Sequence, residues 1–256
     1  RCSTVAAVRA VDPETLGMIT AVAIAFFVVP LAAGALVRTI RPDARWLRLL
    51  LSFSGSFLLG VVFLHMLPEL YAVAGIGIGL WVLSGFLLQV VLEFFSHGIE
   101  HGHMHVHAAP GKVLPFVTLL SLCAHSFTEG MPFADPNVAG DLYFLTGVLL
   151  HKMPMAIALA AVLQRSGAGN ARSWSLLVIF ALAAPFGIFV GSLAGKGIGA
   201  AFLADMLALA IGMLLHISTT IIFESAPEHR FNAARFVAVI VGAALAAFLL
   251  VGHTHA

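Results

Sequence analysis

Residues 141–164 read DLYFLTGVLLHKMPMAIALAAVLQ, a long apolar run with a histidine and a lysine at its centre. A helix that crosses a bilayer needs about 20 mostly apolar residues. A charged side chain at mid-bilayer costs about 2.5–3.5 kcal/mol on insertion scales and marks a functional position by default. The run therefore predicts a transmembrane helix in which His151 and Lys152 have a function.

The rest of the chain has the same apolar character. Of its 256 residues, 61% are hydrophobic and only 10% are charged, whereas soluble domains carry about 25% charged residues. This composition predicts an all-α integral membrane protein that forms a single transmembrane domain over residues 1–256. A net charge of +1 with no basic patch argues against a nucleic-acid partner.

Apolar runs separated by polar or glycine-rich breaks predict eight spans. We expect them at 15–38, 46–72, 77–98, 112–134, 141–164, 173–195, 201–224 and 231–252. The second span carries LHMLPE (64–69), and the seventh carries LHIS (215–218) followed by APE (226–228). This similarity favours a 3+2+3 arrangement, with two inverted three-helix repeats around a central pair of spans. Chance likeness between two oily helices is the alternative.

Basic residues orient the spans, because cytoplasmic loops are enriched in lysine and arginine. One side of the membrane holds nine of them: Arg38, Arg41, Arg45, Arg48, Lys112, Arg165, Arg172, Arg230 and Arg235. The other side holds three: Arg1, Arg9 and Lys196. We therefore expect both termini outside, with the plasma (inner) membrane as the location. The loop over 97–112 is then cytoplasmic.

Two neighbouring spans place metal-ligating residues at similar depth. His125 and Glu129 are four residues apart and share one helical face. A short connection makes the spans that carry them and His151 antiparallel neighbours. Imidazole nitrogen and carboxylate oxygen are ligands for a divalent metal such as zinc. We predict a mid-membrane metal site at His125, Glu129 and His151; a hydrogen-bonded pair that joins helices is the alternative for the first two.

The predicted cytoplasmic loop is rich in histidine. Residues 97–107 read HGIEHGHMHVH, and such a tract is typical of metal binding. We expect metal capture by its five histidines: His97, His101, His103, His105 and His107.

These motifs together resemble the ZIP (Zrt/Irt-like) family of metal transporters. The resemblance rests on HSFTEG (125–130), HKMP (151–154), HMLPE (65–69) and the histidine-rich loop. It implies an eight-helix bundle that moves zinc, iron or manganese into the cytoplasm by alternating access, with the metal as substrate. A homodimer is compatible with the sequence and is not specified by it.

The family's core ligands carry over to His125, Ser126, Glu129 and His151, and Met155 stands where many members have a glutamate. Members with two adjacent metals have acids where this chain has Lys152 and Ala184. We therefore expect one weakly bound metal, with the Lys152 ammonium in place of a second ion. Lys152 has three candidate partners: Glu129, Glu93 and Glu224. His65 and His216 are expected as supporting ligands or pathway steps, and Glu69 as an attractor of cations at the outer side.

Three other functions are compatible with the same residues. An intramembrane zinc hydrolase would use Glu129 to activate a metal-bound water, with His125, His151 and His216 as ligands. A bis-histidine haem protein would need His65 and His216 to face each other across the bundle. A metal sensor would bind the ion without moving it.

Overall fold

The computed structural model describes residues 12–40, 43–96, 98, 116–165, 169–224 and 232–251. Every regular element in these ranges is helical. The α-helices are α1 (Pro13–Ile40), α2 (Ala44–Val61), α3 (Leu67–Ala74), α4 (Gly79–Ser96), α5 (Phe116–Gly130), α6 (Pro136–Gly140), α7 (Leu142–Arg165), α8 (Asn170–Gly197), α9 (Ala200–Glu224) and α10 (Ala233–Val251). A π-helical turn, η1 (Val62–Met66), joins α2 to α3, and the 3₁₀ turns η2 (Ile76–Ile78) and η4 (Met131–Ala134) follow α3 and α5.

Aspartate side chains begin several of these helices. Asp12 accepts a hydrogen bond from the Glu14 amide, and Asp43 accepts one from the Arg45 amide, both at 3.3 Å. Such caps satisfy amides that have no partner inside the helix. Gly75 follows the C-terminal end of α3. Its φ of 71° is a conformation that favours glycine, and it turns the chain toward α4.

Seven segments of the described chain are long and apolar enough to cross a membrane. They correspond to seven of the eight predicted spans. The remaining predicted span, 112–134, is described from residue 116 onward as the 15-residue α5 followed by η4. Pro132 has no amide hydrogen to donate to an α-helix, and this accounts for the change to a 3₁₀ turn after Gly130. An all-α membrane protein is confirmed, and seven of the eight predicted spans have a counterpart among these segments.

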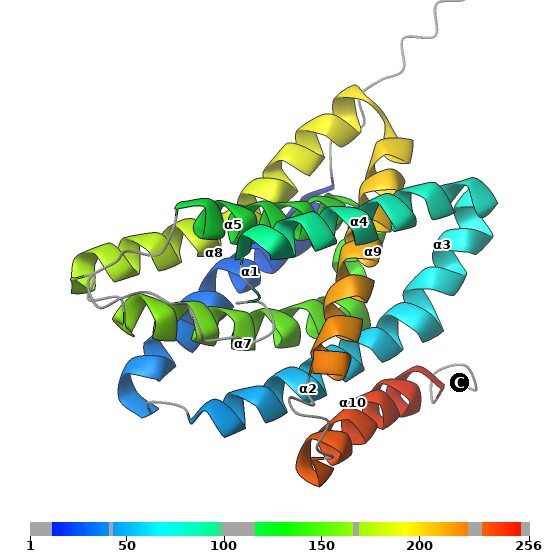
Figure 1. The fold of residues 1–256 in the computed structure, drawn as a ribbon. Helices are drawn as coiled ribbons and strands as arrows, with labels where there is room; N and C mark the ends of the chain where they lie inside the picture. Colours follow the sequence, from blue (N-terminus) through cyan, green and yellow to red (C-terminus); the bar gives the residue numbers. More distant parts are fainter. Residues whose placement is uncertain are drawn as a thin grey trace, which may run out of the picture.

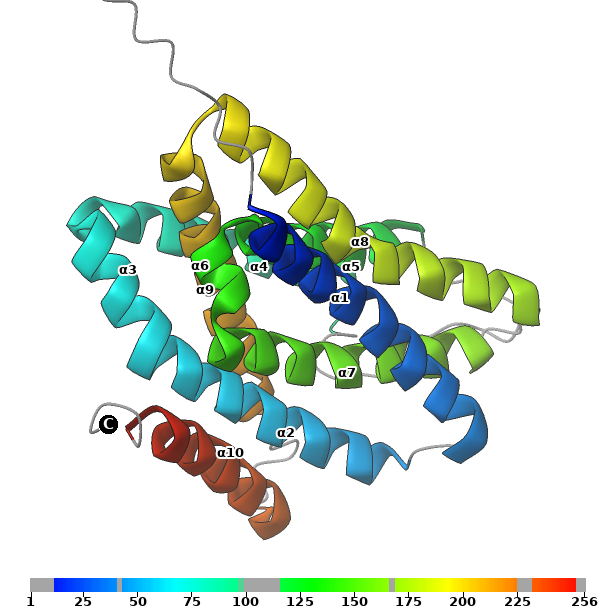
Figure 2. The same ribbon diagram turned by 180° about the vertical axis from the view of Figure 1, so that it is seen from behind.

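The helices pack in two groups that meet at the centre (Figures 1 and 2). In one group, α8 packs against α5 and α1, and α1 also packs against α7. In the other, α10 lies along α2, and α9 packs against α4 and α2. The groups join where α7 contacts α2 and where α5 contacts α4. The polar residues singled out in α5 and α7 therefore lie on helices at the junction.

Close backbone contact holds α4 against α9. A Cβ atom added at Gly85 would overlap the Leu209 carbonyl, and one at Gly212 would overlap the Val82 carbonyl. Small residues at membrane helix interfaces permit this approach, because packing drives helix association in lipid.

We therefore expect Gly212→Ala to lower the free energy of unfolding in detergent by about 1–3 kcal/mol, since an overpacked interface must separate. Gly17→Ala is the matched control, because a Cβ there meets no atom within 4 Å. Chemical denaturation of the two variants checks this. Equal stability of the two variants would contradict the close contact.

Candidate functional site

The centre of the molecule contains a group of polar side chains that are shielded from the surroundings. His125, Ser126 and Glu129 of α5 and His151 and Lys152 of α7 are each at most 1% exposed. Their helices are packed so that polar groups face inward, because ionisable groups in lipid would be far more costly. The structure thus brings the predicted metal ligands of both spans into one buried region.

Lys152 pairs with Glu129. Its ammonium donates a hydrogen bond to Oε2 of Glu129, and both side chains are buried. Of the three partners considered for this lysine, Glu129 is in contact with it, Glu93 pairs with His216, and the side chain of Glu224 lies outside the described residues. The Phe26 ring centroid lies 5.1 Å from the Lys152 nitrogen, close enough for a cation–π interaction. Two groups of opposite charge are therefore buried next to each other.

Two other buried oxygens beside this pair make no hydrogen bond within the described chain: Oε1 of Glu129 and Oγ of Ser126. Buried polar atoms are normally satisfied, so such exceptions point to a missing partner. Oxygen atoms with available lone pairs are ligands for a divalent cation. The chemistry of these positions fits a metal ion as cargo.

The two core histidines face each other at close range. The ring centroids of His125 and His151 are 6.3 Å apart, with the rings nearly perpendicular. His125 Nδ1 lies 3.0 Å from Oε1 of Gln89 on α4. Because an amide oxygen only accepts, Nδ1 carries the hydrogen and Nε2 carries the lone pair. Gln89 thus orients His125 as a hydrogen-bonded support orients a metal-binding imidazole.

Met155 and Pro154 complete this part of α7. Met155 is fully buried and belongs to an apolar cluster with Leu122 and Leu159. The helix continues through Pro154, although proline removes one backbone hydrogen bond in such a position.

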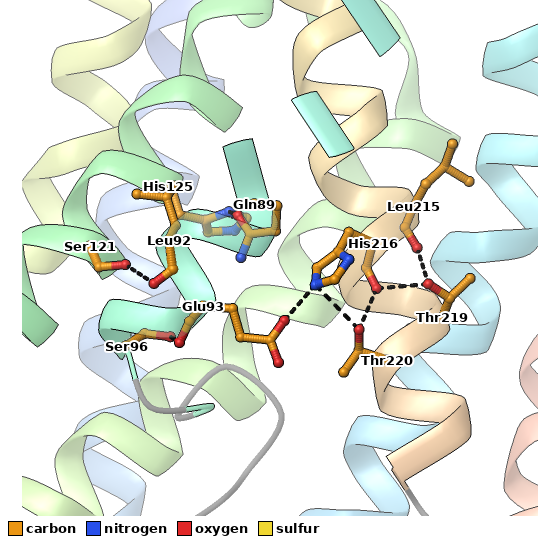
Figure 3. A network of polar contacts seen from close by, with 10 residues as sticks. All are labelled: Gln89, Leu92, Glu93, Ser96, Ser121, His125, Leu215, His216, Thr219 and Thr220. Atoms are coloured by element: carbon orange, nitrogen blue, oxygen red, sulfur yellow. Dashed lines mark hydrogen bonds and ion pairs between the residues drawn. The ribbon is translucent and has the colours of Figure 1, made fainter. Parts of the chain in front are cut away.

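A second polar group links α4 to α9 (Figure 3). Nε2 of His216 lies 2.5 Å from Oε2 of Glu93, and the Thr220 hydroxyl lies 3.4 Å from the same nitrogen. Glu93 is one helical turn after Gln89, so the two groups adjoin along α4. The Ser121 hydroxyl donates to the Leu92 carbonyl, which ties α5 to α4 at this level. We call the region of His125, Glu129 and His151 the core site. His216 therefore lies beside a carboxylate between this core site and the end of α4.

A third group lies at the junction of η1, α3 and α7. Nε2 of His65 is 2.7 Å from Oδ2 of Asp141, and Nδ1 of His65 is 3.6 Å from Oε1 of Glu69. His65 and His216 thus contact different carboxylates, and the haem hypothesis, which needs them to face each other, gains no support.

Some expected residues lie outside the described ranges. These are the loop histidines His97, His101, His103, His105 and His107, together with the side chain of Glu224. Of the predicted loop over 97–112, only Gly98 is described.

With this geometry established, comparison with known proteins decides the family. The family model described as "ZIP Zinc transporter" matches residues 100–250, more than half of the chain. The chain belongs to the ZIP zinc transporter family. The resemblance stated from the motifs is thereby confirmed.

Individual ZIP relatives agree with the family match. The chain is 33% identical over 187 residues to "Zinc transporter ZIP13" of Bos taurus, covering 55% of this chain and 44% of the relative. It is 34% identical over 158 residues to "Zinc transporter ZIP13" of Pongo abelii, covering 55% and 46% respectively. It is 23% identical over 284 residues to "Zinc transporter ZIP13 homolog" of Drosophila melanogaster, covering 83% and 80%. The chain spans about half the length of the first two relatives.

The sequence analysis did not identify two polar residues that this ZIP chain places beside the predicted histidines. Gln89 supports His125 from a helix 36 residues away, and Asp141 contacts His65 across 76 residues. Gln89 is a polar amide inside an apolar span, and Asp141 stands at a helix start, where capping explains it. The position of Gln89 inside an apolar span could have identified it from the sequence. Asp141 could not be identified in this way, because helix capping already explains an aspartate at its position.

Proposed function

We propose that the chain transports divalent metal ions, zinc above all, across the membrane by alternating access. The observation that carries this proposal is the burial of His125, Glu129 and His151 on α5 and α7, with an imidazole pair and a carboxylate in one region. The family match supports it. The relatives named above are zinc transporters by name, and nothing comparable supports the hydrolase.

In this proposal the three side chains are metal ligands, and Ser126 adds a hydroxyl oxygen. Imidazole nitrogens favour zinc over manganese, and iron is an intermediate case. The metal shares Glu129 with Lys152, whose ammonium holds Oε2, so the bound ion meets the repulsion of that ammonium. One carboxylate shared in this way predicts weak binding and ready release, as conduction requires.

The helix contacts support the proposed 3+2+3 arrangement with inverted repeats. The proposed symmetry exchanges the first three spans with the last three (α1 with α8, α2 with α9 and α4 with α10), and it exchanges α5 with α7. This exchange maps the α2–α10 contact onto the α9–α4 contact. The same exchange maps the α5–α8 contact onto the α7–α1 contact. All four of these contacts occur in the structure. A pairwise match of this kind is what a pseudo-twofold axis in the membrane plane produces.

The proposed orientation rests on the basic residues, and the proposed direction of transport, into the cytoplasm, rests on the resemblance to the family. Nine lysines and arginines on one side against three on the other favour both termini outside. Metal then enters the cytoplasm, where the histidine-rich loop receives it, and the plasma (inner) membrane is the proposed location. The proposal extends to a homodimer, which cross-linking in the membrane tests.

Uptake of zinc into proteoliposomes tests the function. We expect saturable uptake by the wild-type chain and a rate lower by at least about tenfold for His125→Ala, because a ligand and its Gln89 support are lost together. Ser175→Ala is a suitable control, since this exposed hydroxyl bonds only within α8. Zinc binding without uptake would favour a sensor, and lipid or peptide cleavage without uptake would favour the hydrolase.

A further inference from the structure

Three metal-ligating side chains gather at one end of the bundle, apart from the core site. One ligand atom from each of His65, Glu69 and Asp141 lies within 4.8 Å of the others. We propose that His65 and Glu69 form a second divalent-cation site, with Asp141 as the carboxylate that orients His65. The site would capture the ion before it passes to the core, and in this role it rests on the proposed function.

The distances distinguish a cation site from a hydrogen-bonded pair. The 3.6 Å between His65 Nδ1 and Glu69 Oε1 is too long for a hydrogen bond. A tetrahedral zinc ion with ligands at about 2.0–2.2 Å holds nitrogen and oxygen roughly 3.4 Å apart. The two atoms therefore stand at nearly the separation that a shared zinc ion needs.

Asp141 fixes the imidazole in the required form. Oδ2 of Asp141 is 2.7 Å from His65 Nε2 and accepts its hydrogen. The lone pair of the neutral ring is then on Nδ1, which faces Glu69. Carboxylate–histidine–metal arrangements of this kind are the common outer support of zinc sites.

The backbone holds both partners in place. Oδ1 of Asp141 accepts hydrogen bonds from the amides of Tyr143 at 3.1 Å and Phe144 at 3.0 Å, so this carboxylate also caps α7. His65 lies in η1, where the Leu67 amide bonds to the Val62 carbonyl five residues earlier. Pro68 follows directly and has no amide hydrogen. Single π-helical turns inside α-helices are frequent at functional sites.

The three side chains form a path from the surroundings inward. The Glu69 side chain is 64% exposed, His65 24% and Asp141 12%. Glu69 and Asp141 also line a cavity of about 220 Å³, together with Asp135. No lysine or arginine lines it among the described residues. Three carboxylates without a basic neighbour attract cations into such a cavity.

This cavity is at the end of the bundle that we propose to face outside, near Gly75 and α6. With two protein ligands and otherwise water, the site binds weakly. Weak sites in series let an ion advance without becoming trapped.

Zinc titration of the purified full chain tests the site by itself. In a variant with alanine at His125 and His151, which removes two core ligands, and at the five loop histidines, we expect a weak zinc site that depends on Glu69 to remain. Adding Glu69→Gln should abolish it, and adding Asp141→Asn should weaken it by about 10–100-fold, since asparagine retains the cap but loses the charge. Glu14→Gln is the control, because this exposed carboxylate does not line the cavity.

Uptake by proteoliposomes tests its role. Glu69→Gln should raise the zinc concentration for half-maximal uptake at least about threefold and leave the maximal rate unchanged, because capture and not translocation is impaired. Wild-type kinetics and unchanged binding in Glu69→Gln would overturn the outer site while leaving transport intact. A wild-type chain that retains the Glu69-dependent site but moves no zinc would instead refute the proposed function.

Discussion

Replacing Glu129 with glutamine is expected to abolish zinc uptake and to lower the free energy of unfolding by about 3–5 kcal/mol. The stability loss follows because Lys152, which is fully buried, loses the anion beside it. The loss of uptake follows because Glu129 is the carboxylate ligand of the proposed core site. The two effects have different causes and can be separated.

The double variant Glu129→Gln/Lys152→Met separates them. Removing both charges of a buried pair is often neutral or stabilising, because neither has to be desolvated. We expect denaturation in detergent to return to near the wild-type midpoint while uptake remains absent. Restored uptake in the double variant would show that Glu129 serves structure alone, and an unrescued midpoint would show that the ion pair is not the cause of the instability.

The positions of most helices could be predicted from the sequence, because long apolar runs have few alternatives in lipid. The predicted span 141–164 is the helix Leu142–Arg165, and 201–224 is Ala200–Glu224. The π-helical turn at Val62–Met66 left no signal in the apolar pattern. This turn forms because Pro68 has no amide hydrogen to donate to a carbonyl of the preceding turn, and because of the packing around the turn.

The grouping of the candidate core ligands was predictable, because ionisable side chains are costly inside apolar spans and are therefore conspicuous in the sequence. His125 and Glu129 on one face, with His151 at similar depth, follow from helical spacing and a short connection. The partner of Lys152 did not follow, since Glu93 and Glu129 are both carboxylates within spans. Only tertiary packing assigns Glu93 to His216 and Glu129 to Lys152.

The structure adds a relation between the two histidines that the sequence had paired by motif. His65 of LHMLPE and His216 of LHIS each contact a carboxylate, Asp141 and Glu93 respectively. If the repeats are inverted as proposed, these two pairs lie toward opposite sides of the core site. The motif similarity then has a physical meaning, since each repeat supplies one histidine–carboxylate step on the path of the ion.

Replacing Lys152 with aspartate is expected to tighten zinc binding at the core by at least about tenfold, or 1.4 kcal/mol. The ammonium holds Oε2 of Glu129, so an arriving cation that binds this carboxylate is repelled by it. Near a buried site, one pair of unit charges at 4 Å is worth about 4 kcal/mol at an effective dielectric constant of 20. Aspartate removes the repulsion and adds an anionic ligand, and desolvation of that ligand offsets part of the gain.

Lys152→Met is the matched variant, because it removes the competing charge without supplying a ligand. Zinc affinity should therefore rise in the order lysine, methionine, aspartate, as measured by equilibrium titration in a background that carries Glu69→Gln and alanine at the five loop histidines. Uptake should respond differently. An ion that binds more tightly leaves more slowly, so the maximal rate of the aspartate variant should fall below that of the wild type. Affinity in the aspartate variant equal to or below that of the wild type would show that Lys152 does not occupy the place of a cation.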